Sequence, residues 1–436
     1  MLRSFRVENY KSIRAEVELL LMPTYDKGQL AVPVAGIFGA NASGKSSLLG
    51  AMQWMREAVA SSHFRWDPDG GIPRQPFLLD DSSRAKPSTF VVELLIDDVR
   101  YVYGFEVDDQ RVLDEWLYTY PKNRKRVIFE REGGKINFGS TVAEARERAD
   151  VLADMTRPNA LLVSVAARSK LHAATKVAGW FDNGIRILDG RRGPKQGQRL
   201  ARMIDTDPER AKVVIDLLRA ADVGISGVDR DADGVATSEA TTLRVHASRG
   251  PDSSNEPLRA LADELGLEIQ HRRLALRHGS DGTSLPFEDE SSGTHAWLGL
   301  TIDVVEALDQ GLTLVVDEID SSLHPRLTAH LVSLFHAADA NQRGAQLIFA
   351  THDATLLGSV AGEDILRRDE VWFIEKERGT GASTLFALSD FHPRKEENTE
   401  RRYLGGSYGA VPDVTEQDFR RALGLDPWGI VNGATA

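Results

Sequence analysis

The sequence predicts an α/β fold with a doubly wound, mostly parallel sheet, a flanking antiparallel β-subdomain and an inserted compact helical lobe. Near the N-terminus, a glycine-rich loop stands between an apolar strand and an amphipathic helix. Beyond residue 310, two further apolar runs each end in polar residues. The region between them changes from period-two alternation to helical spacing. A chain of 436 residues can hold one large domain with an insertion, or two domains.

The loop Gly39–Ser46 fits the pattern G-x-x-x-x-G-K-[ST] without deviation. The apolar stretch Val32–Phe38 before it predicts a buried strand, and Ser46–Met55 after it predicts a helix. Because unpaired N–H groups and the helix dipole both favour an anion there, we expect a site for the phosphates of ATP. Lys45 would neutralise the β/γ oxygens and Ser46 would bind Mg²⁺ through its hydroxyl. The predicted nucleotide ligands in this loop are Gly39, Asn41, Ala42, Ser43, Gly44, Lys45, Ser46 and Ser47.

The run Leu312–Glu318 consists of branched apolar residues and stops at two carboxylates. A buried parallel strand is expected to be apolar throughout, so two acids at its end need a partner. We expect Asp317 to hold Mg²⁺ through its water shell and Glu318 to orient and deprotonate the attacking water. Exposed acids at a strand end are common in α/β proteins, but the phosphate loop favours the catalytic interpretation.

A third apolar strand, Gln346–Thr351, ends at His352. The histidine follows the two acids by one helix and one strand, which suits the next strand of a doubly wound sheet. Ligands gather at the carboxyl ends of such strands, and we therefore expect His352 to contact the γ-phosphate. A lone histidine at a strand end is more often structural, and that alternative remains open here.

The segment Glu290–Thr294 precedes an apolar-periodic stretch, Trp297–Val305, that predicts a helix. Small hydroxyl residues and glycine at a helix N-terminus make a second anion site, and the alternative is an ordinary helix cap. One chain cannot easily bring two such helix ends to opposite sides of one γ-phosphate, whereas two chains packed head to tail can. We therefore expect Ser291, Ser292 and Gly293 to complete the ATP site of a second copy.

Taken together, these motifs resemble the ABC-type ATPases of the SMC, RecF and OLD group, within the AAA family. Glu290–Thr294 lines up with the signature LSGGQ, although Ser292 replaces its first glycine. Ile319–Pro325 resembles the D-loop, with His324 where transporters carry aspartate, a form that looks like the RecF and OLD branch. The resemblance implies a P-loop ABC-type ATPase fold, hydrolysis of ATP with Mg²⁺, and closure as a head-to-tail homodimer or higher homo-oligomer.

The opening strand and the N-[FY]-[KR]-S-type turn after it also resemble that branch, in which this turn lies near the nucleotide. The resemblance implies that Asn9, Lys11 and Ser12 approach the phosphates. A Q-loop glutamine is not obvious: Gln75 is the preferred candidate and Gln110 the other.

More narrowly, the chain resembles the stand-alone ATPases of bacterial anti-phage and abortive-infection systems, of the RloA kind. The ESSGT form of the signature, the DEIDSSLHP stretch and residues 368–394 carry this resemblance. It implies a separate effector as partner, such as a nuclease or a toxin. The D-x-D spacings within Asp229–Gly234 fall in a run that we interpret as a turn, so no Toprim nuclease domain is expected. The alternatives are a RecF-like DNA repair or recombination clamp, and a scaffold in which ATP is structural.

We expect residues 1–140 to form the N-terminal part of the ATPase domain, with the phosphate loop and the antiparallel β-subdomain. Residues 141–275 would form the inserted helical lobe, which lacks the sustained heptads of the long SMC coiled-coil arm. Residues 276–390 would carry the signature, the Asp-Glu strand, the D-loop and His352. Residues 391–436 would form a polar C-terminal tail, and the stretch Asp390–Asp413 is either a docking strip or a disordered end.

The formal charge of −12 argues against a broadly electropositive nucleic-acid surface. DNA contact stays open only through local patches, Lys122–Arg126 and Arg191–Arg199. The chain has no cysteine, which excludes disulfides and thiolate metal sites. We find no signal sequence and no apolar run of roughly 18 residues, so we expect a cytoplasmic protein that does not cross a membrane.

Overall fold

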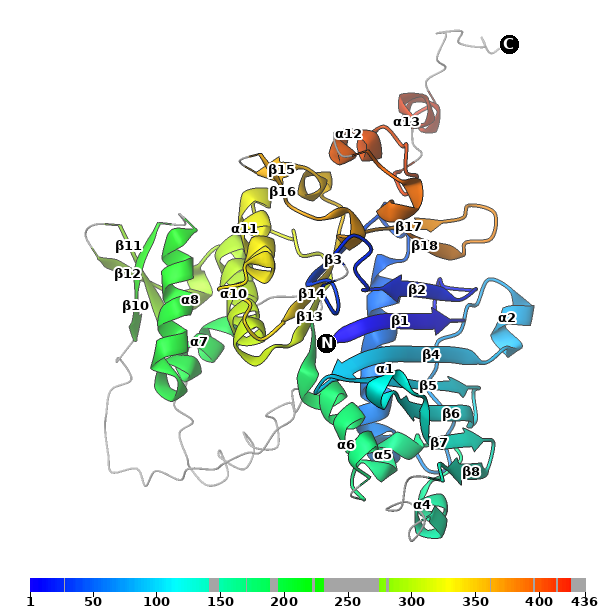
Figure 1. The fold of residues 1–436 in the computed structure, drawn as a ribbon. Coiled ribbons are helices and arrows are strands. Elements are labelled where there is room, and N and C mark those ends of the chain that lie inside the picture. The colour runs from blue at the N-terminus through cyan, green and yellow to red at the C-terminus, as the bar shows by residue number, and fades with distance from the viewer. Residues whose placement is uncertain are drawn as a thin grey trace, which may run out of the picture. The chain divides into compact units, whose positions relative to one another are not determined.

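The computed structural model describes residues 1–26, 28–140, 149–169, 171–188, 195–221, 224–230, 274–279, 282–360, 362–394, 397–412 and 415–424. The chain divides into two compact units (Figure 1). The first, here called the nucleotide unit, combines Met1–Gly190 with Ala307–Ala436, and the second, the inserted unit, is Arg191–Glu306. Among the described residues, no helix is both long and apolar enough to cross a membrane.

The centre of the nucleotide unit is a six-stranded sheet in the order β18-β17-β3-β14-β13-β9. Its strands are β3 Val34–Phe38, β9 Ile185–Leu188, β13 Thr313–Val316, β14 Gln346–Thr351, β17 Val371–Lys376 and β18 Ser383–Ala387. All neighbours are parallel except β17 and β18. Every residue of β3, β13 and β14 is buried, as expected of central parallel strands. The predicted α/β class with a mostly parallel sheet is confirmed.

A second sheet of the same unit has seven antiparallel strands in the order β2-β1-β4-β5-β6-β7-β8. They are β1 Leu2–Glu8, β2 Val17–Leu20, β4 Ser88–Ile96, β5 Val99–Val107, β6 Val112–Thr119, β7 Arg126–Glu132 and β8 Lys135–Phe138. Asp97 and Asp98 link β4 to β5 and both have positive φ, 49° and 58°, as a tight hairpin requires. The antiparallel β-subdomain expected from the alternating pattern is therefore present.

The helices of the nucleotide unit are α1 Lys45–Arg65, α2 Asp81–Ala85, α4 Ala149–Met155, α5 Leu162–Ala166, α6 His172–Gly179, α11 Pro325–His336, α12 Thr399–Leu404 and α13 Glu416–Ala422. Short helical turns are η1 Pro121–Asn123, η2 Trp180–Gly184, η4 Ala354–Leu357, η5 Arg368–Glu370 and η6 Leu388–Phe391. Helix α1 contacts both sheets, and its Trp54 stacks on Phe90 of β4 with ring centroids 4.6 Å apart. The helix that begins in the phosphate loop is thus anchored in the common core.

A buried ion pair ties the start of α5, and Ala160 just before it, to the antiparallel sheet. The Glu115 carboxylate accepts hydrogen bonds from the N–H groups of Leu162, at 2.6 Å, and Val163, at 2.9 Å. Arg131 lies 3.7 Å from the same carboxylate and donates to the Ala160 carbonyl at 2.7 Å. The Glu115 side chain is fully buried, and this burial raises its pKa above the usual carboxyl value. Each of the two buried charges is therefore stabilised by the other, and removing one would leave the other buried without its counterion.

The inserted unit contains helices and a small sheet. Its elements are α7 Lys195–Thr206, α8 Pro208–Ala220, β10 Ile225–Arg230, β11 Leu274–His278, β12 Thr283–Pro286, η3 Phe287–Asp289 and most of α10 Ser292–Gln310. The three strands are antiparallel in the order β10-β11-β12. This sheet was not expected from the sequence, and the limits expected for the insert, residues 141–275, differ from those of this unit.

Two expectations about this region are corrected. Asp229 and Arg230 lie in strand β10 rather than in a turn, and Asp229 pairs with Arg277 of the next strand; the rest of the run to Gly234 lies outside the described residues. Arg199 was expected in a basic patch, but it forms ion pairs with carboxylates of α10, including Asp303 at 2.7 Å. The patch therefore loses one of its cations.

Part of the C-terminal tail is ordered against the core. Tyr403 and Tyr408 are 4 % and 2 % exposed, and both rings stack on Phe373 of β17. Residues 397–412 are therefore not the disordered end that the sequence left open. The docking role stays a prediction.

Candidate functional site

The candidate site is a cavity of about 250 Å³ at one edge of the parallel sheet. The residues that line it are Ser12, Asn41, Ala42, Ser43, Gly44, Lys45, Ser46, Ser47, Asp317, Glu318, His352 and Lys376. Strands β3, β13, β14 and β17 run parallel, so their carboxyl ends meet at this edge. Each strand contributes its own group: the phosphate loop, the two acids, the histidine and a lysine.

The phosphate loop has a backbone that only small residues allow. Gly44 has φ 116° and Ala42 has φ 61°. A Cβ atom on Gly39 would overlap the Ile374 carbonyl, and one on Gly44 would overlap the Ser383 hydroxyl. The N–H groups of Asn41, Ala42 and Gly44 have no hydrogen-bond partner among the described residues. Unpartnered backbone donors in left-handed loops form anion-binding concavities, which fits a phosphate group.

Lys45 is held inside this loop. Its ammonium donates to the carbonyl oxygens of Gly39, at 2.6 Å, and Ala40, at 2.9 Å. Burial lowers the pKa of Lys45, while nearby acids, first among them Asp317, oppose that shift. Its present acceptors are neutral, so an anionic phosphate oxygen would offer a stronger, charge-assisted hydrogen bond.

Asp317 follows β13 directly and carries an unsatisfied oxygen. Its N–H donates to the Leu188 carbonyl of β9 at 3.2 Å, which fixes the backbone at this point. Its Oδ1 atom is buried and has no hydrogen-bond partner among the described residues. Such a group calls for a partner, and a carboxylate with the hydroxyl of Ser46 is the oxygen donor set that Mg²⁺ prefers. The residues present therefore fit a magnesium ion that takes its remaining ligands from phosphate and water.

Glu318 adopts an unusual backbone conformation. Its φ is 50°, in the left-handed region that non-glycine residues rarely enter, and its side chain is exposed. The next N–H, of Ile319, donates to the Ala350 carbonyl of β14 at 3.1 Å and so holds the turn against the sheet. Strained residues of this kind concentrate at functional sites, where the surrounding structure enforces them.

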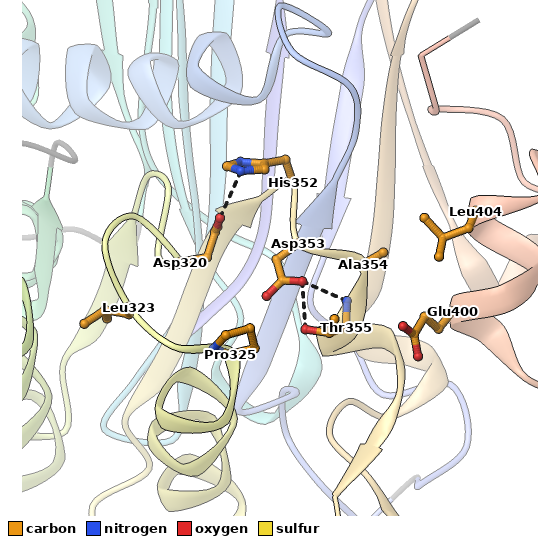
Figure 2. Close-up of a pocket in the computed structure, with 9 residues that line it drawn as sticks. All are labelled: Asp320, Leu323, Pro325, His352, Asp353, Ala354, Thr355, Glu400 and Leu404. Atoms are coloured by element: carbon orange, nitrogen blue, oxygen red, sulfur yellow. Dashed lines mark hydrogen bonds and ion pairs between the residues drawn. The ribbon is translucent and has the colours of Figure 1, made fainter. Parts of the chain in front are cut away.

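His352 lies immediately after β14 and pairs with an acid of the D-loop-like segment. Its Nε2 atom is 3.3 Å from the Oδ2 atom of Asp320 (Figure 2). The other carboxylate oxygen of Asp320 accepts a hydrogen bond from the Thr351 hydroxyl. His352 also lines a neighbouring cavity of about 440 Å³. The other residues around that cavity are Asp320, Leu323, Pro325, Asp353, Ala354, Thr355, Glu400 and Leu404.

Three hydroxyl groups connect the N-terminal turn to the phosphate loop. Ser383 of β18 donates to the Ser43 carbonyl at 2.7 Å. Its hydroxyl oxygen also lies 2.8 Å from that of Ser12, which in turn lies 2.9 Å from the Ser47 hydroxyl. Lys376, at the end of β17, lines the cavity, and its ammonium has no hydrogen bond or ion pair among the described residues. Ser383 and Lys376 were not predicted from the sequence, because only the sheet order places β17 next to β3 and β18 next to β17.

Two predicted ligands lie elsewhere. Asn9 is buried, and its amide donates to backbone carbonyls within residues 83–87, so it anchors that segment rather than a phosphate. Lys11 is not among the residues that line the cavity, and neither are the Q-loop candidates Gln75 and Gln110. Of the N-terminal turn, only Ser12 lies at the site.

The signature-like segment belongs to the inserted unit. The Ser291 hydroxyl accepts a hydrogen bond from the Thr294 N–H at 3.1 Å, as a helix cap does, and α10 begins with Ser292 and Gly293. Glu290, whose side chain is 5 % exposed, lies 2.6 Å from the His278 imidazole of β11. The roles of these residues toward ATP stay a prediction.

Comparison with known proteins gives one family and remote structural likenesses. The profile of the family described as "AAA domain, putative AbiEii toxin, Type IV TA system" matches residues 34–358, most of the chain. No curated protein matches the sequence. An SMC head domain from Thermotoga maritima is 12 % identical, with a TM-score of 0.39 over 88 % of this chain and 98 % of that one.

Two further solved structures match in the same way. An SmcHead bound to the C-winged helix domain of ScpA is 14 % identical, with a TM-score of 0.40 over 90 % of this chain and 99 % of that one. An Smc head domain with an extended coiled coil, bound to the C-terminal domain of ScpA derived from Pyrococcus furiosus, is 13 % identical. Its TM-score is 0.41 over 90 % of this chain and 97 % of that one.

Proposed function

The chain belongs to the family described as "AAA domain, putative AbiEii toxin, Type IV TA system", and we propose that it is an ATP-hydrolysing molecular switch closed by two copies head to tail. One observation carries this proposal. The ends of β3, β13, β14 and β17 surround a single cavity with a phosphate loop, two carboxylates, a histidine and a lysine. These are the groups that phosphoanhydride hydrolysis requires.

ATP binds with its phosphates in the loop Gly39–Ser46. The unpartnered N–H groups of Asn41, Ala42 and Gly44 supply donors, and the N-terminus of α1 adds the favourable end of a helix dipole. Lys45 leaves its carbonyl acceptors for the β/γ oxygens, where its charge is better compensated.

The Ser46 hydroxyl and Asp317, whose Oδ1 atom has no partner among the described residues, would hold Mg²⁺. When bound, the ion neutralises charge that accumulates on the phosphate oxygens during hydrolysis. The described part of the chain has no cluster of three or more His, Asp or Glu side chains that could hold a metal alone. A magnesium ion that shares phosphate and water ligands needs no such cluster.

Glu318 is the general base. Its exposed carboxylate orients a water molecule and accepts a proton from it as the water oxygen attacks the γ-phosphorus. The bond from that phosphorus to the β–γ bridging oxygen breaks, ADP leaves with the bridging oxygen, and phosphate is released. His352, oriented by Asp320, contacts the γ-phosphate and distinguishes ATP from ADP.

The second copy supplies Ser291, Ser292 and Gly293 to the opposite side of the γ-phosphate. Support comes from the start of α10 at Ser292, which leaves the first N–H groups of that helix without partners in their own helix. An anion is favoured at such an end. Binding of ATP therefore links the copies, and hydrolysis releases them.

The family description points to a toxin–antitoxin context. We propose that the closed dimer, in the cytoplasm, is the ATPase and sensor component of an anti-phage defence system and controls a separate effector such as a nuclease or toxin. A gene for such an effector beside the gene for this chain would support this, and an isolated gene would count against it.

A RecF-like DNA clamp is the second candidate, favoured by the exposed turn Lys122–Arg126 in the antiparallel sheet. This turn gathers four basic side chains in a short stretch, although the whole chain has a formal charge of −12. Stimulation of ATP hydrolysis by DNA in the purified protein, lost when this turn is neutralised, would favour the clamp over the defence switch.

The mass of the purified Glu318→Gln variant in solution, with and without Mg-ATP, tests the switch. Without a base, ATP should remain bound and the mass should double, whereas Lys45→Ala should not respond to ATP. If Glu318→Gln binds ATP but has the same mass with and without Mg-ATP, closure by two copies would be contradicted.

A further inference from the structure

The segment Tyr403–Ala410, here called the strap, packs beside the strand that carries the phosphate loop. Tyr403 and Tyr408 stack on Phe373 with ring centroids 5.3 Å and 5.4 Å apart and planes within 15° and 17°. Tyr403 also meets the edge of Phe38, the last residue of β3 before the loop, at 6.2 Å. Aromatic contacts of this kind stabilise beyond the apolar area they bury. The strap is therefore part of the core at the base of the loop.

One hydrogen bond joins the strap to the loop itself. The Ala410 carbonyl accepts from the N–H of Ala40, the second residue of the loop, at 2.8 Å. The Tyr403 hydroxyl donates to the same carbonyl at 3.2 Å. Burial raises the pKa of Tyr403 to about 12, so the hydroxyl keeps its proton at neutral pH. Ala410 is 2 % exposed, and this bond is therefore shielded from water.

The conformation of the strap is fixed by β17. Gly409 and Ala410 have φ 69° and 58°, which turns the Ala410 carbonyl toward the loop. The positive φ of Gly409 favours glycine there, and a Cβ atom would also displace Oε2 of Glu375, which would lie 2.6 Å from it. The same oxygen is 3.4 Å from the N–H of Ala410. The backbone conformation of the strap thus sets the direction of the Ala410 carbonyl, and burial shields it from water.

We propose that the strap is a positioning element for the phosphate loop, an inference that rests on the proposed function. The N–H of Ala40 is taken by the strap, while those of Asn41, Ala42 and Gly44 are left without a partner for an anion. A loop with left-handed residues loses conformational freedom when it binds phosphate. A loop that the strap has already ordered loses less, and it binds more tightly for that reason.

The strap also connects the loop to the second cavity. Helix α12, which ends at Leu404 inside the strap, contributes Glu400 and Leu404 to the cavity that His352 lines (Figure 2). The phosphate loop and the histidine are thus bordered by one continuous piece of chain. By thermodynamic reciprocity, a nucleotide that prefers the ordered loop must also stabilise the strap.

The test compares Ala410→Pro with Ala410→Gly in the full chain. Proline cannot adopt a φ of 58° and removes the carbonyl from its place, whereas glycine adopts this φ without strain. Tyr403→Phe is a milder variant that keeps the ring and removes only the hydroxyl. The first readout is amide hydrogen exchange in residues 38–42 without nucleotide, and the second is the dissociation constant for ATP in the Glu318→Gln background.

We expect exchange in residues 38–42 to accelerate and ATP affinity to fall about fivefold or more in Ala410→Pro. Ala410→Gly should match the parent, and Tyr403→Phe should fall between them. In the parent, ATP should slow exchange within residues 403–410. The proposal would be overturned if Ala410→Pro folds and shows the exchange rates and ATP affinity of the parent. If Ala410→Pro does not fold, the same result in Tyr403→Phe would overturn it.

The exchange readout separates this proposal from the proposed function. A parent that binds no ATP would refute the nucleotide switch, yet exchange in residues 38–42 would still show whether the strap orders the loop. A parent that binds ATP, together with unchanged exchange in every variant, would refute the strap alone.

Discussion

The Nε2 atom of His352 lies 3.3 Å from the Oδ2 atom of Asp320. The Asp320 side chain is 8 % exposed and is fixed by the Thr351 hydroxyl, whereas the imidazole is 59 % exposed. A buried acid from one segment therefore orients an exposed histidine from the next strand, and such a partner also selects the tautomer of the ring. The histidine is turned toward the site by a residue that need not touch the nucleotide.

Replacing Asp320 with alanine should reduce the turnover number for ATP hydrolysis about tenfold, because His352 loses its orienting partner. The dissociation constant for ATP should change little, since the loop and Lys45 remain. Steady-state kinetics with a separate binding measurement would show this division. Asp353→Ala is the matched control: the Asp353 carboxylate lines the same cavity as Asp320 but, within the described part of the chain, accepts hydrogen bonds from Thr355 alone (Figure 2). Equal losses in both variants would contradict the orienting role.

Glu318 should show a conflict between stability and catalysis. Its φ of 50° is unfavourable for any residue with a Cβ atom, so Glu318→Gly should be more stable than Glu318→Ala by about 1 kcal/mol. Both variants should lose ATP hydrolysis, because both lack the carboxylate. Thermal unfolding of the two proteins side by side measures the difference. Equal unfolding midpoints would mean that the turn carries no strain.

The buried pair of Glu115 and Arg131 should be essential for stability. Glu115→Ala leaves the guanidinium buried without its carboxylate and the N–H groups of Leu162 and Val163 without acceptors. We expect a loss of about 3–5 kcal/mol in the free energy of unfolding, measured by urea denaturation. Glu130→Ala, which removes an exposed side chain of the next strand, should cost less than about 1 kcal/mol. Similar losses in the two variants would contradict this account.

Lys376 should contribute to binding of the phosphates. Lys376→Ala should weaken ATP binding about fivefold, because it removes an exposed ammonium that has no other partner among the described residues and is free to contact the phosphate charge. Binding of AMP, which carries fewer charges, should change less. Calorimetry with both nucleotides would resolve the difference, and Lys135→Ala, on strand β8, provides a control far along the antiparallel sheet. Unchanged ATP affinity would exclude Lys376 from the site.

The sequence was sufficient to predict the site where the functional residues come directly after a strand. The phosphate loop, the two acids and His352 each come after an apolar run, and parallel strands bring such ends together, so their common cavity could be anticipated. Their catalytic roles stay predictions. Asn9 shows where the resemblance misled. It matches the asparagine of the family's N-terminal turn, but its amide donates to backbone carbonyls within residues 83–87.

Other elements depend on pairings that no local pattern reveals. Strand β9 has only four residues, Ile185–Leu188, and the parallel partner that makes it a strand, β13, comes more than 100 residues later. Lys376 and Ser383 reach the site because β17 pairs with β3, and the strap depends on stacking with Phe373. Such long-range contacts become visible only when the sheet order is known.

The position of β3 also determines when this protein can acquire its site during synthesis. Both neighbours of β3 in the sheet, β14 and β17, are encoded more than 300 residues after it. A ribosome that has made the phosphate loop must therefore add most of the chain before that loop has a sheet to rest on. Contacts of such separation slow folding and leave apolar strands exposed to aggregation. We expect nascent chains that end before β17 to remain without nucleotide affinity and to need chaperone protection.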